Sequence, residues 1–152
     1  MRVTIAAVGR ERPGPTRELF EEYRRRCPWP IRLLELAPRT SGPPERRRAE
    51  EAERLKAALP RDAVLVALDE SGRSLTSRAF AARIAAWQRQ GRSELVFLIG
   101  GPEGLDPALL DRADLVLALG RMTWPHRFVR VLLAEQLYRA ATIQAGHPYH
   151  RD

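Results

Sequence analysis

Short apolar runs alternate along the chain with longer amphipathic stretches. Five runs rich in Val, Ile, Leu and Ala predict β-strands at 3–8, 31–37, 63–68, 95–99 and 115–119. Between them, apolar residues recur at helical spacing and predict helices at 15–26, 45–59, 76–90, from 106 onward and at 126–144. Strands that alternate with helices indicate an α/β fold: a mostly parallel sheet of five to six strands with helices on both faces.

Three of the predicted strands end in loops suited to holding a ligand. In parallel α/β sheets, ligands bind at the carboxyl ends of the strands. We therefore expect the chemistry after Leu68, in the Gly-Gly-Pro-Glu-Gly loop at 100–104, and in the Gly-Arg-Met-Thr-Trp-Pro-His loop at 120–126. The glycine loop matches neither a Walker A motif nor GxGxxG. On its own it suits a tight strand-to-helix turn as well as a close approach of the backbone to a ligand.

The loop at 120–126 has two readings that are compatible with each other. Its backbone amides could bracket a flat heterocycle. It also looks like the start of a helix, with Thr123 as the cap, Trp124 packed and Pro125 in the first turn.

Length and composition limit the possible classes of protein. A chain of 152 residues, 44% hydrophobic, suits one globular domain, 1–152. It has no apolar run long enough to span a membrane, and its start does not resemble a signal peptide, so we expect a cytoplasmic protein. Cys27 is the single cysteine, which excludes intrachain disulfides, cysteine-rich zinc modules and iron–sulfur clusters.

The net charge of +7 has two explanations. Lys56 is the one lysine among 26 basic residues, so nearly all the positive charge is arginine. A GC-rich genome explains this bias, and so does an RNA partner, because arginine binds phosphate and stacks on bases. Within the helix at 45–59, the run 46–48 is interpreted as a solvated face in preference to an RNA contact.

The three histidines, His126, His147 and His150, do not form a convincing metal site. The pair in the terminal tail has no further ligand nearby in the sequence, so no metal is expected. A Ser-His-Asp hydrolase is also disfavoured, because the chain lacks a GxSxG motif. Tyr149, His150 and Arg151 suit an anionic or base-like partner, and they equally suit a frayed basic tail.

Three sequence stretches together resemble a known family. They are LVFLIGGPEGLDPALL at 95–110, MTWPHRFVRVLLAEQLYRA at 122–140 and the ending HPYHRD at 147–152. The segments VTIAAVGR at 3–10 and VALDESGRSLTS at 66–77 fit as well. In this order and spacing they resemble, over the full length, the RlmH family of SPOUT-class pseudouridine N3-methyltransferases of large-subunit ribosomal RNA.

The resemblance implies S-adenosylmethionine as methyl donor, N3 of a pseudouridine in 23S ribosomal RNA as acceptor, and the assembled ribosome as substrate. It also implies a C-terminal trefoil knot and a homodimer whose active site forms where two subunits meet. The implied cofactor contacts are Leu68, Gly101, Gly120, Arg121, Met122, Thr123, Trp124 and Pro125. The residues implied near the methyl acceptor are His126, Tyr149, His150 and Arg151.

One departure from the family pattern concerns Gly120-Arg121, where many members have Ser followed by a small or basic residue. The missing hydroxyl would remove a side-chain hydrogen bond to the cofactor and leave the backbone contacts.

Either His126 or His150 could accept the proton of the methyl-acceptor nitrogen, and the sequence does not decide between them. Arg151 is expected to hold phosphate or the developing negative charge, and Tyr149 to orient the base. Two other classes remain as alternatives. One is a non-catalytic basic module that binds RNA or a nucleotide. The other is a small dinucleotide- or flavin-binding enzyme, disfavoured because Gly9 is the one glycine in the turn after the first strand.

Overall fold

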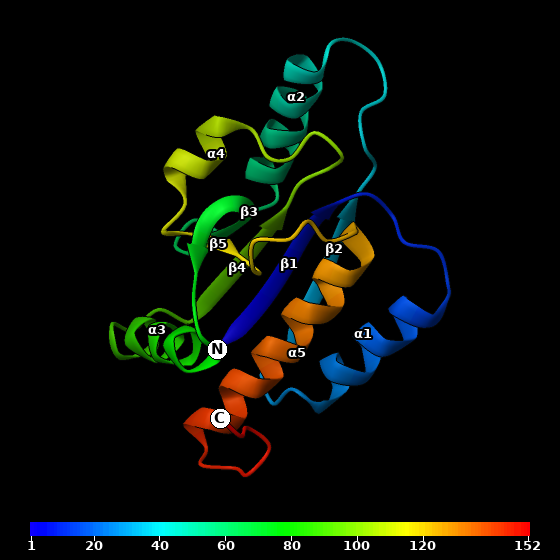
Figure 1. Ribbon diagram of the computed structural model, residues 1–152. Coiled ribbons are helices and arrows are strands. Elements are labelled where there is room, and N and C mark those ends of the chain that lie inside the picture. The colour runs from blue at the N-terminus through cyan, green and yellow to red at the C-terminus, as the bar shows by residue number, and fades with distance from the viewer.

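Five parallel strands form the centre of the protein, and five helices cover them (Figure 1). The computed structural model describes residues 1–152. The strands are β1 (Arg2–Val8), β2 (Ile31–Leu36), β3 (Val64–Ser74), β4 (Glu94–Ile99) and β5 (Leu115–Ala118). The helices are α1 (Pro15–Arg26), α2 (Pro44–Ala57), α3 (Ser77–Arg89), α4 (Pro107–Arg112) and α5 (His126–Gln144). The predicted parallel α/β sheet is confirmed, with five strands.

The strand order β2-β1-β4-β3-β5 determines where the loops meet. Every neighbouring pair is parallel, with Val3 beside Leu95 and Val66 beside Phe97. All the strands therefore end at one edge of the sheet. Because β4, β3 and β5 are adjacent, the three loops expected to carry the chemistry lie next to one another there.

Helices cover both faces of the sheet, which explains why β4 and the first part of β3 are apolar without alternation. On one face, Phe20 of α1, Ile84 of α3 and Leu133 of α5 pack against the strands. On the other face, Leu55 of α2 and Leu109 of α4 form a smaller core. A central strand between two helical layers has no solvent-facing side and so shows no alternation of polar and apolar residues. No helix of the protein has the length and apolar character that a membrane span requires.

The end of β3 differs from the prediction. Residues 69–72 were expected to form a turn that ends the strand, but β3 continues to Ser74 through an irregularity between Leu68 and Arg73. A Cβ atom on Gly72 would lie 2.7 Å from the carbonyl carbon of Val116. Only glycine permits this approach of β3 to β5, so the segment stays in the sheet where a turn was expected.

A buried guanidinium ties α5 to the ends of two strands. Arg130 is 3% exposed, and its Nη1 lies 2.7 Å from Oε2 of Glu35, the residue before the end of β2. Its Nη2 donates to the carbonyl oxygen of Gly9, just after β1, at 2.8 Å. Glu11 lies 3.8 Å from the same guanidinium. These contacts hold the first turns of α5 against the sheet.

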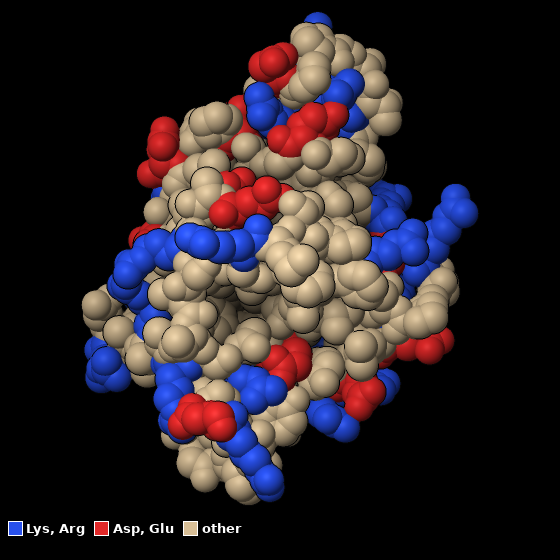
Figure 2. All heavy atoms as spheres, viewed as in Figure 1, with Lys and Arg blue, Asp and Glu red and all other residues tan.

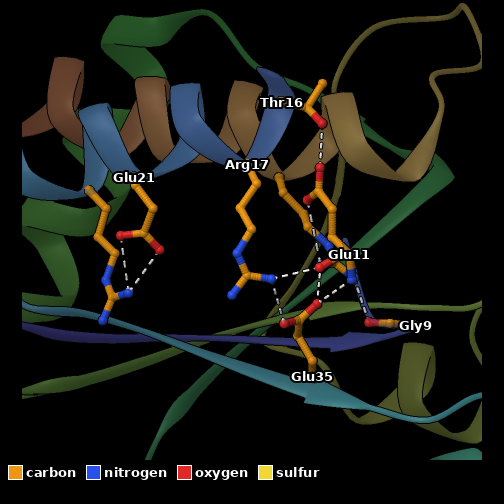
Figure 3. A network of polar contacts seen from close by, with 8 residues as sticks. Gly9, Glu11, Thr16, Arg17, Glu21 and Glu35 are labelled. Carbon is orange, nitrogen blue, oxygen red and sulfur yellow. Dashed lines mark hydrogen bonds and ion pairs between the residues drawn. The ribbon is translucent and has the colours of Figure 1, made fainter. Parts of the chain in front are cut away.

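The polar contacts around Arg130 continue into α1 (Figure 3). Arg17 donates to the carbonyl oxygen of Glu11 at 2.7 Å, and the Thr16 hydroxyl donates to the Glu11 carboxylate. Burial by itself raises the pKa of Glu35, but the amide of Glu11 and the guanidinium of Arg130 outweigh it and lower that pKa. Glu35 is therefore ionised at neutral pH and balances the buried charge of Arg130.

We predict that Arg130→Met lowers the free energy of unfolding by about 3 kcal/mol, because Glu11 would lose its cation and Glu35 the nearer of its two while both remain largely buried. Urea denaturation measures the loss. The control is Arg26→Met, which removes a half-exposed ion pair to Glu22 on α1 and should cost less than about 1 kcal/mol. Similar losses in the two variants would contradict this assignment.

Candidate active site

A pocket of about 800 Å³ opens at the carboxyl ends of β3, β4 and β5. Its walls come from the irregular part of β3 at 68–71, the glycine loop after β4 and the loop between β5 and α5. The lining residues are Leu68, Asp69, Glu70, Ser71, Ile99, Gly100, Gly101, Pro102, Glu103, Gly104, Leu117, Leu119, Gly120, Met122, Thr123, Trp124, His126 and Val129. A volume of this size is typical of small-molecule and cofactor sites.

The glycine loop is folded too tightly for a side chain at Gly100, and Gly101 is crowded by neighbouring side chains. A Cβ atom on Gly100 would lie 2.5 Å from the carbonyl carbon of Gly104. A Cβ atom on Gly101 would lie 3.2 Å from Oε2 of Glu51 and 3.3 Å from Cγ1 of Val8. The amide of Gly104 donates to the carbonyl oxygen of Gly101 at 2.9 Å and closes the turn. The loop is therefore both the tight turn expected from its sequence and one wall of the pocket.

The loop before α5 is held by two side-chain hydrogen bonds. Trp124 donates from Nε1 to the carbonyl oxygen of Leu119 at 3.0 Å. The Thr123 hydroxyl donates to Glu70 at 3.0 Å, which links this loop to the irregular part of β3. Thr123 was expected to cap the helix, but the residue at the N-cap is Pro125 and no side chain caps this end. The threonine instead joins two walls of the pocket.

The structure brings most of the predicted cofactor residues together. Leu68, Gly101, Gly120, Met122, Thr123 and Trp124 line the pocket. Arg121 and Pro125 belong to the same loop but are exposed and do not contribute to the lining. Six of these eight residues therefore line the pocket.

His126, the first residue of α5, also lines the pocket. Burial lowers the pKa of this imidazole, and the positive charge of Arg130, one helical turn away, lowers it further, although the Gly101 backbone opposes both effects. The imidazole is therefore neutral at pH 7. Its Nδ1 atom is buried without a hydrogen-bond partner.

The pocket lining is acidic although the protein as a whole is basic. Asp69, Glu70 and Glu103 are its carboxylates, and its 18 residues include no Lys or Arg. Glu103 forms an ion pair with Arg47 of α2, and the Arg48 guanidinium approaches the Glu103 carbonyl oxygen at 3.5 Å.

These contacts correct the interpretation of the arginine run on α2. Arg46 is exposed and pairs with Glu50, as a solvated face predicts. Arg47 and Arg48 instead point toward the glycine loop and are only partly exposed. The helical periodicity could not show this because Glu103 is more than fifty residues away in the sequence.

The C-terminal tail is packed against the protein and is not frayed. The hydroxyl of Tyr149 donates to Glu135 of α5 at 3.0 Å. The guanidinium of Arg139, also on α5, lies 4.8 Å from the centre of the Tyr149 ring. Arg78 of α3 binds the last residue, Asp152, through Nε at 2.8 Å and Nη2 at 2.6 Å. Arg151 is exposed.

The contacts of His150 determine its tautomer. Nδ1 lies 3.1 Å from Nη1 of Arg139, and a guanidinium can only donate, so Nδ1 must be the acceptor. Nε2 then carries the proton and donates to Asp152 at 3.1 Å. The lone pair of His150 is thus already engaged by Arg139. Sequence reasoning missed Arg139, and the Glu135–Arg139 ion pair at helical i,i+4 spacing was the available signal.

The pocket and the tail lie apart within one chain. Tyr149 reaches Glu135, which is nine residues beyond His126, or about 13 Å along the helix axis. Tyr149, His150 and Arg151 do not line the pocket. One subunit therefore does not bring together all four residues that were expected near the methyl acceptor.

Comparison with known proteins identifies the family. A family model described as "Predicted SPOUT methyltransferase" matches residues 1–150. Proteins named "Ribosomal RNA large subunit methyltransferase H" from Rhodospirillum centenum and Brucella anthropi are each 54% identical, with 99% and 100% of both chains covered respectively. A solved structure of "a probable methylase family protein from Haemophilus influenzae" shares the fold, with a TM-score of 0.60, 13% identity, and 99% of this chain and 70% of that chain covered. The chain thus belongs to the SPOUT methyltransferase family.

Proposed function

We propose that the whole chain, 1–152, is one catalytic domain that transfers a methyl group from S-adenosylmethionine to N3 of a pseudouridine in 23S ribosomal RNA of the large subunit. The observation that carries this proposal is the pocket at the carboxyl ends of β3, β4 and β5 in a member of a methyltransferase family. The ribosomal target is supported by the names of full-length relatives. Acting on the assembled ribosome, the protein would work in the cytoplasm.

The residues of the pocket fit this cofactor. Gly100 and Gly101 bring the backbone to the wall, and apolar Leu68 and Leu117 suit a flat base. The amides of residues 120–124 donate to no other backbone group and are available as donors. Gly120 has a φ of 103°, a backbone conformation that favours glycine. Without a serine hydroxyl at this position, the backbone contacts of the loop would remain to hold the cofactor. When bound, the cofactor supplies a methyl group on a positively charged sulfur.

The acceptor nitrogen needs a base, and His126 fits this role better than His150. N3 of a pseudouridine is an imide nitrogen, a weak nucleophile until its proton leaves. His126 lines the pocket and is neutral. Its Nδ1 atom is buried, which leaves Nε2 as the nitrogen that a substrate can reach. His150 already accepts from Arg139 through its only lone pair. We therefore propose His126 as the proton acceptor, directly or through a water molecule.

We propose that the tail acts on the pocket of a second subunit in a homodimer. Tyr149 would orient or stack on the target base, His150 would contact it, and Arg151 would hold phosphate or the developing negative charge. Exposed apolar side chains support an interface beside the pocket. Met122, Trp124 and Phe128 are all exposed, and all three lie in or just after the loop 120–125.

The surface charge suits a partner rich in phosphate. Figure 2 shows basic side chains spread around this face of the protein, with acidic side chains interspersed. Two subunits carry 2 × 7 = 14 formal positive charges. Because cations on a protein displace the counterions of RNA, we expect the attraction to weaken steeply with salt.

The alternative of a nucleotide or dinucleotide site is less consistent with the pocket. Phosphates bind where backbone amides are combined with Lys or Arg. Asp69, Glu70 and Glu103 instead give this pocket negative charge. The same carboxylates are compatible with a positively charged sulfur.

Titration calorimetry tests the cofactor. We expect binding of S-adenosylmethionine with a roughly micromolar dissociation constant, and roughly tenfold weaker binding by Gly101→Ala, because the added Cβ pushes the loop away from Glu51 and Val8. Gly14→Ala is the control, since a Cβ at Gly14 meets nothing within 4 Å. If the wild-type protein does not bind, with or without ribosomes, the non-catalytic module is favoured.

Mixed dimers test the shared active site. We expect His126→Ala and His150→Ala each to slow methylation of ribosomes strongly while remaining dimeric. An equal mixture should recover about a quarter of wild-type activity, because half of the dimers are mixed and each has one complete site. Recovery requires that the two residues act from different subunits. If the mixture is as inactive as its components, they act from the same chain.

Mass mapping tests the target. Large-subunit ribosomal RNA from a strain lacking this protein should lack one methyl group, at a pseudouridine, and incubation of its ribosomes with the protein and S-adenosylmethionine should restore that group. Restoration on a uridine, or on free RNA as readily as on ribosomes, would contradict the proposed substrate.

A further inference from the structure

We infer that the acidic lining of the pocket, with Glu70 as its main determinant, selects the positively charged methyl donor over its neutral demethylated product. The inference rests on the proposed function and adds a specificity-determining residue to the same site. The pocket differs in the sign of its charge from the protein as a whole. The protein carries +7 overall, yet the pocket has three carboxylates and neither Lys nor Arg in its lining.

The three carboxylates differ in how far their charge is compensated. Glu103 forms an ion pair with Arg47, so much of its charge is neutralised. Asp69 accepts from the amide of Ser71 at 2.9 Å, which stabilises a turn and provides no cation. Glu70 accepts only from the uncharged hydroxyl of Thr123, at 3.0 Å. Neither Asp69 nor Glu70 therefore has a cation beside it in the pocket lining.

Glu70 is also placed to act on a ligand. Its partner Thr123 belongs to the loop that would hold the cofactor, so the carboxylate spans two walls of the pocket. The hydrogen bond fixes the carboxylate there without cancelling its charge. Asp69 has a mainly local role because it closes a turn on Ser71. A substitution at Glu70 is thus the cleaner way to change the charge of the pocket.

The reaction itself changes the charge that the pocket holds. Methyl transfer breaks the sulfur–methyl bond, leaves both bonding electrons on sulfur and forms the bond to N3, while the N3 proton passes to the base. The sulfur changes from a sulfonium to an uncharged thioether, and the remainder of the cofactor is unchanged. A negatively charged pocket therefore binds the donor more tightly than the product, and the attraction is lost when transfer is complete.

The experiment compares S-adenosylmethionine with S-adenosylhomocysteine by titration calorimetry at low salt. The measured quantity is the ratio of the two dissociation constants, in which structural effects common to both ligands cancel. We expect the wild-type protein to prefer the donor. Glu70→Gln keeps an oxygen that accepts from Thr123 but removes the charge, so the preference should fall roughly threefold to tenfold, through weaker donor binding.

Two further variants test the sign and the location of the effect. Arg47→Gln removes the cation beside Glu103, so the preference for the donor should increase. Glu53→Gln makes the same change of charge as Glu70→Gln, but on α2, where the side chain is 74% exposed and outside the pocket, and the preference should not change.

The outcomes separate this inference from the proposed function. If both ligands bind the wild-type protein equally, or if Glu70→Gln leaves the ratio unchanged, the inference is wrong and the proposed cofactor stands. If neither ligand binds, the proposed function is overturned and this inference with it. A fall in the ratio for Glu53→Gln equal to that for Glu70→Gln would show a general effect of net charge and would also overturn the inference.

Discussion

Arg130 is almost completely buried, and a guanidinium in that position requires nearby carboxylates. Glu35 and Glu11 supply them from the end of β2 and from the loop after β1. Because Arg130 is one turn after the start of α5, this contact fixes the position and rotation of the helix where the loop 120–125 joins it. The orientation of His126 toward the pocket follows from the same contact, as does the course of α5 toward the C-terminal tail. One ion cluster thus supports both halves of the proposed active site.

The second constraint is the small space between the loops at the edge of the sheet. Gly72 allows β3 to approach β5, and Gly100 allows the glycine loop to fold against itself. With larger residues at either position, the adjoining backbone would have to move apart. The pocket therefore depends on missing side chains as much as on the residues that line it.

The apolar pattern predicted the fold well because it reports burial, and burial follows from the layers. Except at the end of β3, the boundaries of the predicted strands and helices agree with the structure to within two residues. The same argument placed the site, since in a parallel sheet the strand ends must share an edge. The trefoil knot was different: it is implied by the family, and no local pattern encodes the order in which segments pass one another.

The errors at the site share one physical origin: each arose from a contact between residues far apart in the sequence. Thr123 was expected to cap α5, but its hydroxyl bonds to Glu70, fifty-three positions earlier. Arg47 was expected to face solvent, but it reaches Glu103. The local sequence limits which contacts a side chain can make, and the tertiary structure determines which of these contacts form.

The folded tail has a consequence for how two molecules would meet. Contacts with Glu135, Arg139 and Arg78 already fix Tyr149, His150 and Asp152 in the single chain. Ordering a flexible segment costs roughly 1–2 kcal/mol of conformational entropy per residue, and here that loss has occurred before any partner arrives. A preorganised tail leaves more of the contact energy for affinity and selects among partners by shape, because it cannot adapt to a surface that does not match it.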